Sequence, residues 1–78
     1  MKNTLKNLLA DVLKIPADRI TDSFTMSMAE EWDSLKHMEL IVTLEESFQA
    51  QFSFDEIVRM RSLEDILNIL DEKEITGP

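Results

Sequence analysis

Apolar residues recur along most of the chain with the period of an α-helix. Near the N-terminus, the i, i+3, i+4, i+7, i+8 spacing holds Leu5, Leu8, Leu9, Val12 and Leu13. Asn3 or Thr4 can cap the start of this helix, and Pro16 stops it, because the residue before a proline resists helical geometry. The pattern predicts a helix from about Thr4 to Lys14.

The segment from residue 16 to 33 breaks this period. It mixes turn-forming residues with isolated apolar side chains at Ile20, Phe24, Met26 and Met28. A connection of this length in a compact domain is usually functional or is packed by its own side chains. We therefore expect a long loop that these four side chains pin across the helices.

Three further helices follow the loop. Asp33 or Ser34 can cap a helix from Ser34 to about Phe48. Ser53 and Glu56 have the spacing of a capping box, which opens a short helix carrying Ile57 and Met60.

The last helix begins after a cap at Ser62 and ends near Glu72. Its apolar face is Leu63, Ile66, Leu67, Ile69 and Leu70. The fold class is therefore all-α: a small four-helix bundle of three longer helices plus a short third helix, with the long loop between the first two. We expect one domain over residues 1–78, with residues 73–78 as a frayed tail.

The second helix carries apolar residues on two sides. Leu40, Ile41, Leu44 and Phe48 form the side that a bundle helix buries. The opposite side holds apolar and acidic residues together: Leu35, Met38, Val42, Glu39, Glu45 and Glu46. The third helix or the long loop could cover this side, but burying unpaired carboxylates is costly. We therefore predict an exposed apolar stripe with an acidic rim, which is typical of an interaction surface.

The composition narrows the function. The 8 Lys and Arg against 16 Asp and Glu give a net charge of −8, which argues against nucleic acid and anionic membranes and favours a basic partner. The absence of cysteine excludes disulfides, Cys-based metal sites and thiol catalysis by the chain itself, and no metal site is expected. No signal peptide and no membrane span are recognisable, so we expect a soluble cytoplasmic protein.

Few residues suggest catalysis. His37 is the one histidine, it is more typical of a packed or surface residue, and one histidine supports no confident catalytic triad. Arg59 and Arg61 are expected to pair with nearby acids at the junction of the last two helices.

Ser34 opens the second helix at the positive end of its dipole, where a phosphate would be stabilised, although most serines at such positions only cap the helix. The segment Asp33–Phe48 begins D-S-L and continues with Glu39, Leu40, Leu44, Glu45, Glu46 and Phe48 in register. This pattern resembles the second helix of acyl carrier proteins. The resemblance extends over nearly the whole chain, including the long first loop and the short third helix.

The resemblance implies a carrier and not an enzyme, with no catalytic residues of its own. Ser34 would carry covalent 4′-phosphopantetheine, whose thiol holds acyl groups, so that a chain without cysteine still works with a thiol. A phosphopantetheinyl transferase would attach the arm from coenzyme A, with Mg²⁺ needed only during loading and Asp33 helping to position metal and substrate.

By the same resemblance, Leu35, Met38 and Val42 would meet partner enzymes, with Glu39, Glu45 and Glu46 pairing with their basic patches. These partners would be acyl-transferring, condensing or ligase enzymes, and the carrier itself is expected to be a monomer.

Trp32 departs from many fatty-acid carriers, which have a small residue before D-S-L. With a tryptophan at this position, the chain resembles stand-alone carriers of polyketide or other specialised pathways. A fatty-acid pathway stays possible. Trp32 either anchors the loop end or faces a partner. Alternatives are a D-alanyl or peptidyl carrier, or, outside this class, an acidic helical adaptor or immunity-like protein that binds a basic partner without a cofactor.

Overall fold

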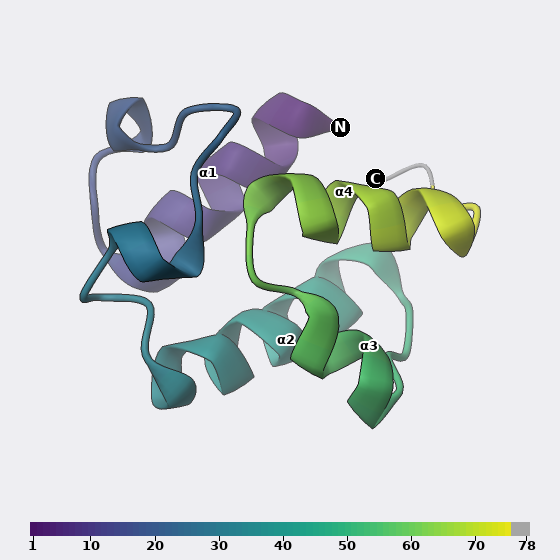
Figure 1. Ribbon diagram of the computed structural model, residues 1–78. Coiled ribbons are helices and arrows are strands. Elements are labelled where there is room, and N and C mark those ends of the chain that lie inside the picture. Colours follow the sequence, from purple (N-terminus) through teal and green to yellow (C-terminus); the bar gives the residue numbers. More distant parts are fainter. Residues whose placement is uncertain (76–78) are drawn as a thin grey trace.

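The computed structural model describes residues 1–75 and is built from four α-helices (Figure 1). They are α1 (Lys2–Leu13), α2 (Ser34–Phe48), α3 (Phe54–Arg59) and α4 (Leu63–Glu72). Two short 3₁₀ turns, Ala17–Arg19 and Met26–Met28, lie in the long loop between α1 and α2. No strand occurs in the described range, so the all-α bundle with one short third helix is confirmed.

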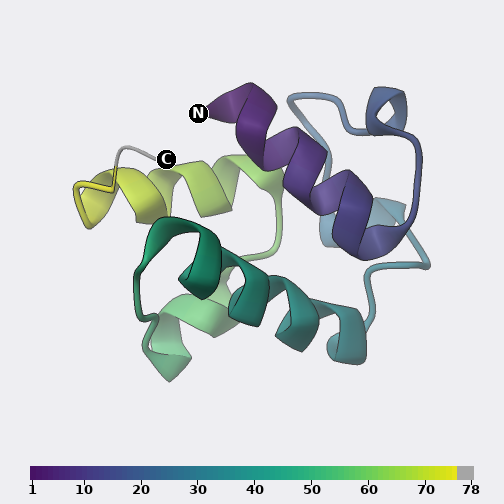
Figure 2. The same ribbon diagram turned by 180° about the vertical axis from the view of Figure 1, so that it is seen from behind.

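The core lies where α1, α2 and α4 face one another (Figures 1 and 2). Each helix contributes fully buried aliphatic side chains at helical spacing: Leu5, Leu9 and Leu13 from α1, Leu40 and Leu44 from α2, and Leu63, Ile66, Ile69 and Leu70 from α4. The period-3.6 pattern of the sequence thus marks the buried faces correctly. In α4 the third of the five predicted face positions departs slightly, because Leu67 is only partly buried.

The first helix begins earlier than the capping residues suggested. α1 starts at Lys2, the N-cap is Met1 without a side-chain cap, and the Leu5 N–H donates to the Met1 carbonyl over 2.9 Å. The prediction of a cap at Asn3 or Thr4 is therefore wrong, because nothing in the first residues opposes helical geometry. The end is as expected: Lys14 adopts the left-handed region with φ 58° and closes the helix before Pro16.

The long loop is held by both its apolar side chains and its backbone. Ile20 and Phe24 are buried and Met26 is half-buried, as predicted, but Met28 is 60% exposed, so the prediction that it anchors the loop is wrong. The Met26 N–H donates to the Arg61 carbonyl over 2.8 Å. The loop is thereby fastened to the connection between α3 and α4.

Two further contacts hold the same loop. The Leu63 N–H donates to the Phe24 carbonyl over 3.0 Å, and Lys6 of α1 forms an ion pair with Asp22 over 2.8 Å. The Lys6 side chain, together with Lys2, lowers the pKa of the Asp22 carboxyl below its ordinary value. These contacts thus fix the position of the loop and of the start of α2 that follows it.

Side-chain caps fix the starts of the other helices. The Lys36 N–H donates to Asp33 Oδ1 over 2.9 Å, so Asp33 is the N-cap and Ser34 is the first residue of α2. Ser53 and Glu56 form the predicted capping box of α3, and Ser62 caps α4. The caps predicted for these three helices are confirmed.

Part of the expected frayed tail is ordered. Lys73 forms an ion pair with Glu56 over 3.1 Å, and the Ile75 N–H donates to the Leu70 carbonyl over 2.9 Å. The partly buried Ile75 side chain also packs against the core. Residues 73–75 are therefore held by α3 and α4, while the last three residues of that prediction lie outside the described range.

Candidate functional site

Ser34 occupies an exposed position at the head of α2. It follows the N-cap Asp33 and precedes Leu35, and its side chain is accessible to solvent. The N–H groups of a first helical turn have no partner within the helix, and the dipole there favours negative charge. An anionic group attached to Ser34 would thus lie in a favourable field.

A groove of about 320 Å³ begins beside Ser34 and runs between α2 and α3. Its walls are mostly apolar. The lining residues are Met26, Ser34, His37, Met38, Phe54, Ile57, Val58, Met60 and Arg61. A long, mainly uncharged chain fixed to the Ser34 oxygen could lie along this surface.

His37 lines the groove next to Ser34 and is held there by Trp32. Trp32 is buried and stacks on Phe24 with ring centroids 5.9 Å apart, so of the two roles considered it takes that of a loop anchor. Its Nε1–H donates to His37 Nδ1 over 3.0 Å. Because Nδ1 accepts, the neutral ring carries its proton on Nε2, which donates to the Ile57 carbonyl over 2.9 Å. His37 therefore links the loop end, α2 and α3.

The second apolar side of α2 is exposed, as predicted. The exposed fractions of Leu35, Met38 and Val42 are 70%, 51% and 52%. Met38 also lines the groove, so the exposed apolar surface continues from α2 onto α3, where Phe54 is 81% exposed.

The three carboxylates of this side have different surroundings. Glu39 is exposed and lies 3.3 Å from Lys36 Nζ, and Glu46 is exposed as well. Glu45 is half-buried, and its Oε2 accepts the Phe52 N–H over 3.0 Å. Glu45 thus stabilises the connection to α3 in addition to any role at the surface.

Two other carboxylates near the site are engaged by basic groups. Arg19 forms an ion pair with Glu31 over 2.9 Å, and this hydrogen bond lowers the pKa of the Glu31 carboxyl. The pKa of Glu56 is also lowered, first by the hydrogen bond from the Ser53 backbone and then by Lys73. These contacts fasten the end of the long loop to its first 3₁₀ turn, and α3 to the residue that follows α4.

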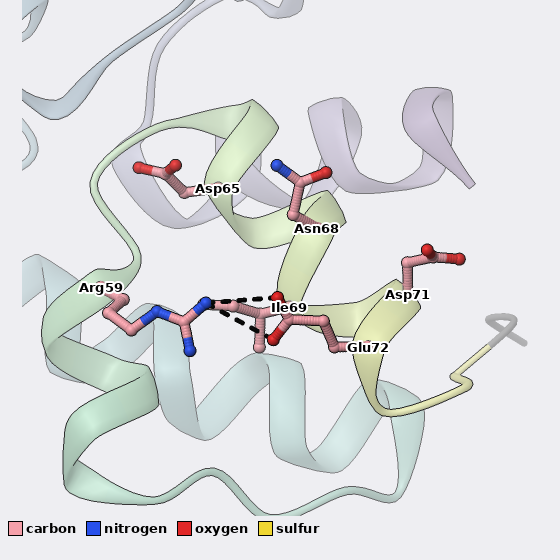
Figure 3. Close-up of a pocket in the computed structure, with 6 residues that line it drawn as sticks. All are labelled: Arg59, Asp65, Asn68, Ile69, Asp71 and Glu72. Carbon is pink, nitrogen blue, oxygen red and sulfur yellow. Dashed lines mark hydrogen bonds and ion pairs between the residues drawn. The ribbon is translucent and has the colours of Figure 1, made fainter.

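Arg59 and Arg61 behave differently, although both were expected to pair with acids. Arg59 Nη2 lies 3.3 Å from Glu72 Oε2 of α4, and Figure 3 shows this pair across a small polar hollow. Arg61 makes no ion pair within residues 1–75, so the expectation for it is wrong. Its carbonyl accepts the Met26 N–H, and Arg61 lines both the groove and a second hollow that Asp65 of α4 also lines.

The sequence reasoning missed the part that α3 plays in this site. Phe54 and Val58 are large exposed side chains on the groove wall. A signal was available: Phe54 and Val58 are spaced i, i+4, which puts both on one side of the short helix.

Metal sites and membrane spans are not found in the described part of the chain. No cluster of three or more His, Asp or Glu side chains there could hold a metal ion. None of its helices is long and apolar enough to cross a bilayer.

The comparison with protein families identifies the class. The family model described as "Phosphopantetheine attachment site" matches residues 3–70, which include Ser34 and every helix of the core. The chain therefore belongs to this family, and the expected kinship with acyl carrier proteins is confirmed. Members of the family are carriers, which also confirms that the protein is not an enzyme.

Two curated relatives cover most of the chain. An acyl carrier protein of Thermosynechococcus vestitus is 26% identical over 69 residues, 88% of this chain and 85% of that protein. Polyketide-8 synthase acyl carrier protein 1 of Streptomyces avermitilis is 27% identical over 71 residues, 91% of this chain and 84% of that protein. The similarity extends along the whole fold and is not confined to the α2 motif.

Proposed function

We propose that Ser34 carries 4′-phosphopantetheine and that the protein presents acyl groups on this arm to biosynthetic enzymes. The observation that carries the proposal is the position of Ser34: an exposed hydroxyl at the head of α2, at the mouth of an apolar groove, in a chain of the phosphopantetheine attachment family. Residues 1–78 act as one carrier domain, and the carrier works as a monomer.

The chain supplies the attachment atom and its surroundings. Ser34 Oγ forms the new bond to phosphorus and loses its proton, while adenosine 3′,5′-bisphosphate leaves from coenzyme A. The N–H groups of the first turn of α2 favour the phosphodiester that results. When bound, the arm supplies a thiol that holds an acyl group as a thioester.

Asp33 helps during loading. Its Oδ1 accepts the Lys36 N–H, which orients the carboxylate next to Ser34. Its other oxygen then serves the Mg²⁺ that the transferase uses, because hard cations prefer carboxylate oxygens. Mg²⁺ is needed only in that reaction.

The exposed side of α2 is the docking surface of this function. Leu35, Met38 and Val42 supply apolar contact with the transferase and with acyl-transferring, condensing or ligase enzymes. Glu39, Glu45 and Glu46 around them attract basic patches, which raises association rates. Eight acids against one lysine between residues 30 and 56 support this charge-guided docking.

Trp32 supports a specialised pathway over primary fatty-acid synthesis. It stands where many fatty-acid carriers have a small residue, and one curated relative is named for a polyketide synthase. We therefore infer that the acyl groups belong to a polyketide or similar pathway in the cytoplasm, with fatty-acid and D-alanyl carriers as the nearest alternatives.

Intact-mass measurement tests the attachment. The protein incubated with coenzyme A, Mg²⁺ and a broad-specificity transferase should gain one phosphopantetheine. Ser34→Ala should gain none, whereas Ser47→Ala, at an exposed serine of the same helix, should be loaded normally. A chain that gains no mass with several transferases is not a carrier, and the cofactor-free adaptor would then be the better hypothesis.

A further inference from the structure

Arg61 is the charged residue of the groove, and it forms no ion pair within residues 1–75. The groove is lined by Ser34, His37 and Arg61 among otherwise apolar side chains, and no carboxylate is among its lining residues in the described chain. Both ring nitrogens of His37 are already hydrogen-bonded. Arg61 is therefore the cationic side chain that the groove offers to an anion.

The neighbouring arginine shows how unusual this is. Arg59, two positions earlier, is paired with Glu72, and Arg19 is paired with Glu31. In a chain with 16 acidic and 8 basic residues, an unpaired arginine is unexpected. Asp65 of α4 lines a second hollow together with Arg61, but the two form no ion pair.

The backbone fixes where the Arg61 side chain begins. The Arg61 carbonyl accepts the Met26 N–H over 2.8 Å, and the Arg61 N–H donates to the Arg59 carbonyl over 3.0 Å. An isolated antiparallel bridge joins Thr25 to Ser62 directly beside it. Arg61 is thus held opposite the head of α2 by the same contacts that fix the loop.

We propose that Arg61 binds the phosphodiester of the arm on Ser34 and so lays the arm along the groove between α2 and α3. This inference rests on the proposed function. Charge complementarity supports it: the phosphodiester is formed directly on Ser34, which lines the same groove, and a guanidinium pairs with phosphate through two parallel hydrogen bonds. Arg61 is a positioning residue and takes no part in loading or acyl transfer.

The consequence is a difference between the apo and holo protein. A phosphodiester adds negative charge to a chain of net charge −8, and unpaired it would add to the repulsion within the fold. Paired with Arg61, it instead links the head of α2 to the connection between α3 and α4. Loading should therefore stabilise the wild type, although it increases the net charge.

The test compares apo and holo forms of the wild type, Arg61→Gln and Arg59→Gln, with loading verified by intact mass. At low salt we expect loading to raise Tm by about 2 °C in the wild type and Arg59→Gln, and to leave it unchanged or lower it in Arg61→Gln. About 0.5 M NaCl should remove most of the gain, because salt screens an exposed pair. In proton–nitrogen NMR spectra, the Arg61 Nε–H signal should move on loading, and the Arg59 signal should not.

Three results would overturn the proposal. Arg61→Gln could gain as much Tm as the wild type, or the Arg61 signal could stay in place on loading. Finally, the Arg61 signal could move only when the arm carries a succinyl group, and not when it carries a butyryl group or no acyl group. Arg61 would then bind the carboxylate of the acyl group and not the phosphodiester. Failure of the proposed function is read separately, as the absence of any mass gain on Ser34, and it would remove the phosphodiester and this proposal together.

Discussion

The two apolar sides of α2, a helix of 15 residues, differ in burial: one is covered by other helices and the other is exposed. Leu40 and Leu44 are completely buried against α1 and α4, while Leu35 and Val42 are more than half exposed. The side chains are similar in size and hydrophobicity, so composition does not separate them. What separates them is the number of faces that four helices can cover: α1 and α4 cover one side, and α3 is too short to cover the other.

The difference matters because the two sides do different work. The buried side holds the bundle together, and truncating its side chains should unfold the protein. The exposed side contributes little to stability and is free to contact other proteins, with the groove and Ser34 at its edge. Four experiments test this difference between the buried and the exposed parts of the molecule.

The largest effect is expected from the same truncation on the two sides. Leu44→Ala removes a fully buried side chain and should lower the free energy of unfolding by about 3 kcal/mol, from lost transfer energy and the cavity left behind. Val42→Ala should change it by less than about 0.5 kcal/mol. Urea unfolding followed by circular dichroism measures both. Equal losses would mean that the exposed side is covered after all.

The next effect concerns the anchor beside Ser34. Trp32→Phe keeps most of the ring but removes the donor to His37 Nδ1, and should cost about 2 kcal/mol. Adding His37→Ala to this variant should then cost less than His37→Ala does in the wild type. Strictly additive losses in this double-mutant cycle would show that the hydrogen bond is unimportant.

A smaller, pH-dependent effect is expected at the start of α3. The Ser53 backbone and Lys73 hold the pKa of Glu56 below its ordinary 4.5. A carboxyl whose pKa is lowered on folding contributes stability above the unfolded value, and loses it as the pH falls through the folded value. Glu56→Gln should therefore lower Tm at about pH 7 and leave it unchanged at about pH 3. Glu46→Gln is the control on the exposed side of α2, and a loss of the same size for Glu56→Gln at both pH values would contradict the assignment.

The smallest effect on stability should accompany a clear effect on loading. Glu39→Lys changes an exposed side chain and should alter the free energy of unfolding by less than about 0.5 kcal/mol. Attachment of phosphopantetheine should slow about tenfold, because the basic transferase is no longer attracted. Asp11→Lys makes the same charge change on α1 and should leave the rate nearly unchanged. If both variants slow equally, net charge and not the α2 face guides docking.

Local signals predicted the helices well. Asp33, Ser53 and Ser62 mark the starts of α2, α3 and α4, because each side chain accepts an N–H within its own first turn. The start of α1 was predicted wrongly, since this helix begins at Lys2 without a side-chain cap. The loop anchors were right at Ile20 and Phe24 and wrong at Met28, because burial depends on where the loop passes over the bundle.

The site was predictable only in part. The D-S-L motif and the second apolar side of α2 could be read from spacing along one helix. The groove could not, because it also needs Met26, Phe54, Val58 and Arg61, which come from three separate segments. The sequence does not show the partner of an arginine either. Arg59 and Arg61 have similar acidic neighbours in sequence, but within residues 1–75 Arg59 forms an ion pair and Arg61 does not.

The amino-acid sequence alone was enough to predict the helical period, the caps of α2, α3 and α4, the excess of acid around Ser34 and the absence of a protein thiol. These are local or additive properties, which neighbouring residues decide. The inward position of Trp32, its hydrogen bond to His37 and the place of Arg61 in the groove beside Ser34 become visible only in the folded structure. Those outcomes depend on residues far apart in the chain that meet only when the loop closes over α1 and is tied to the start of α4.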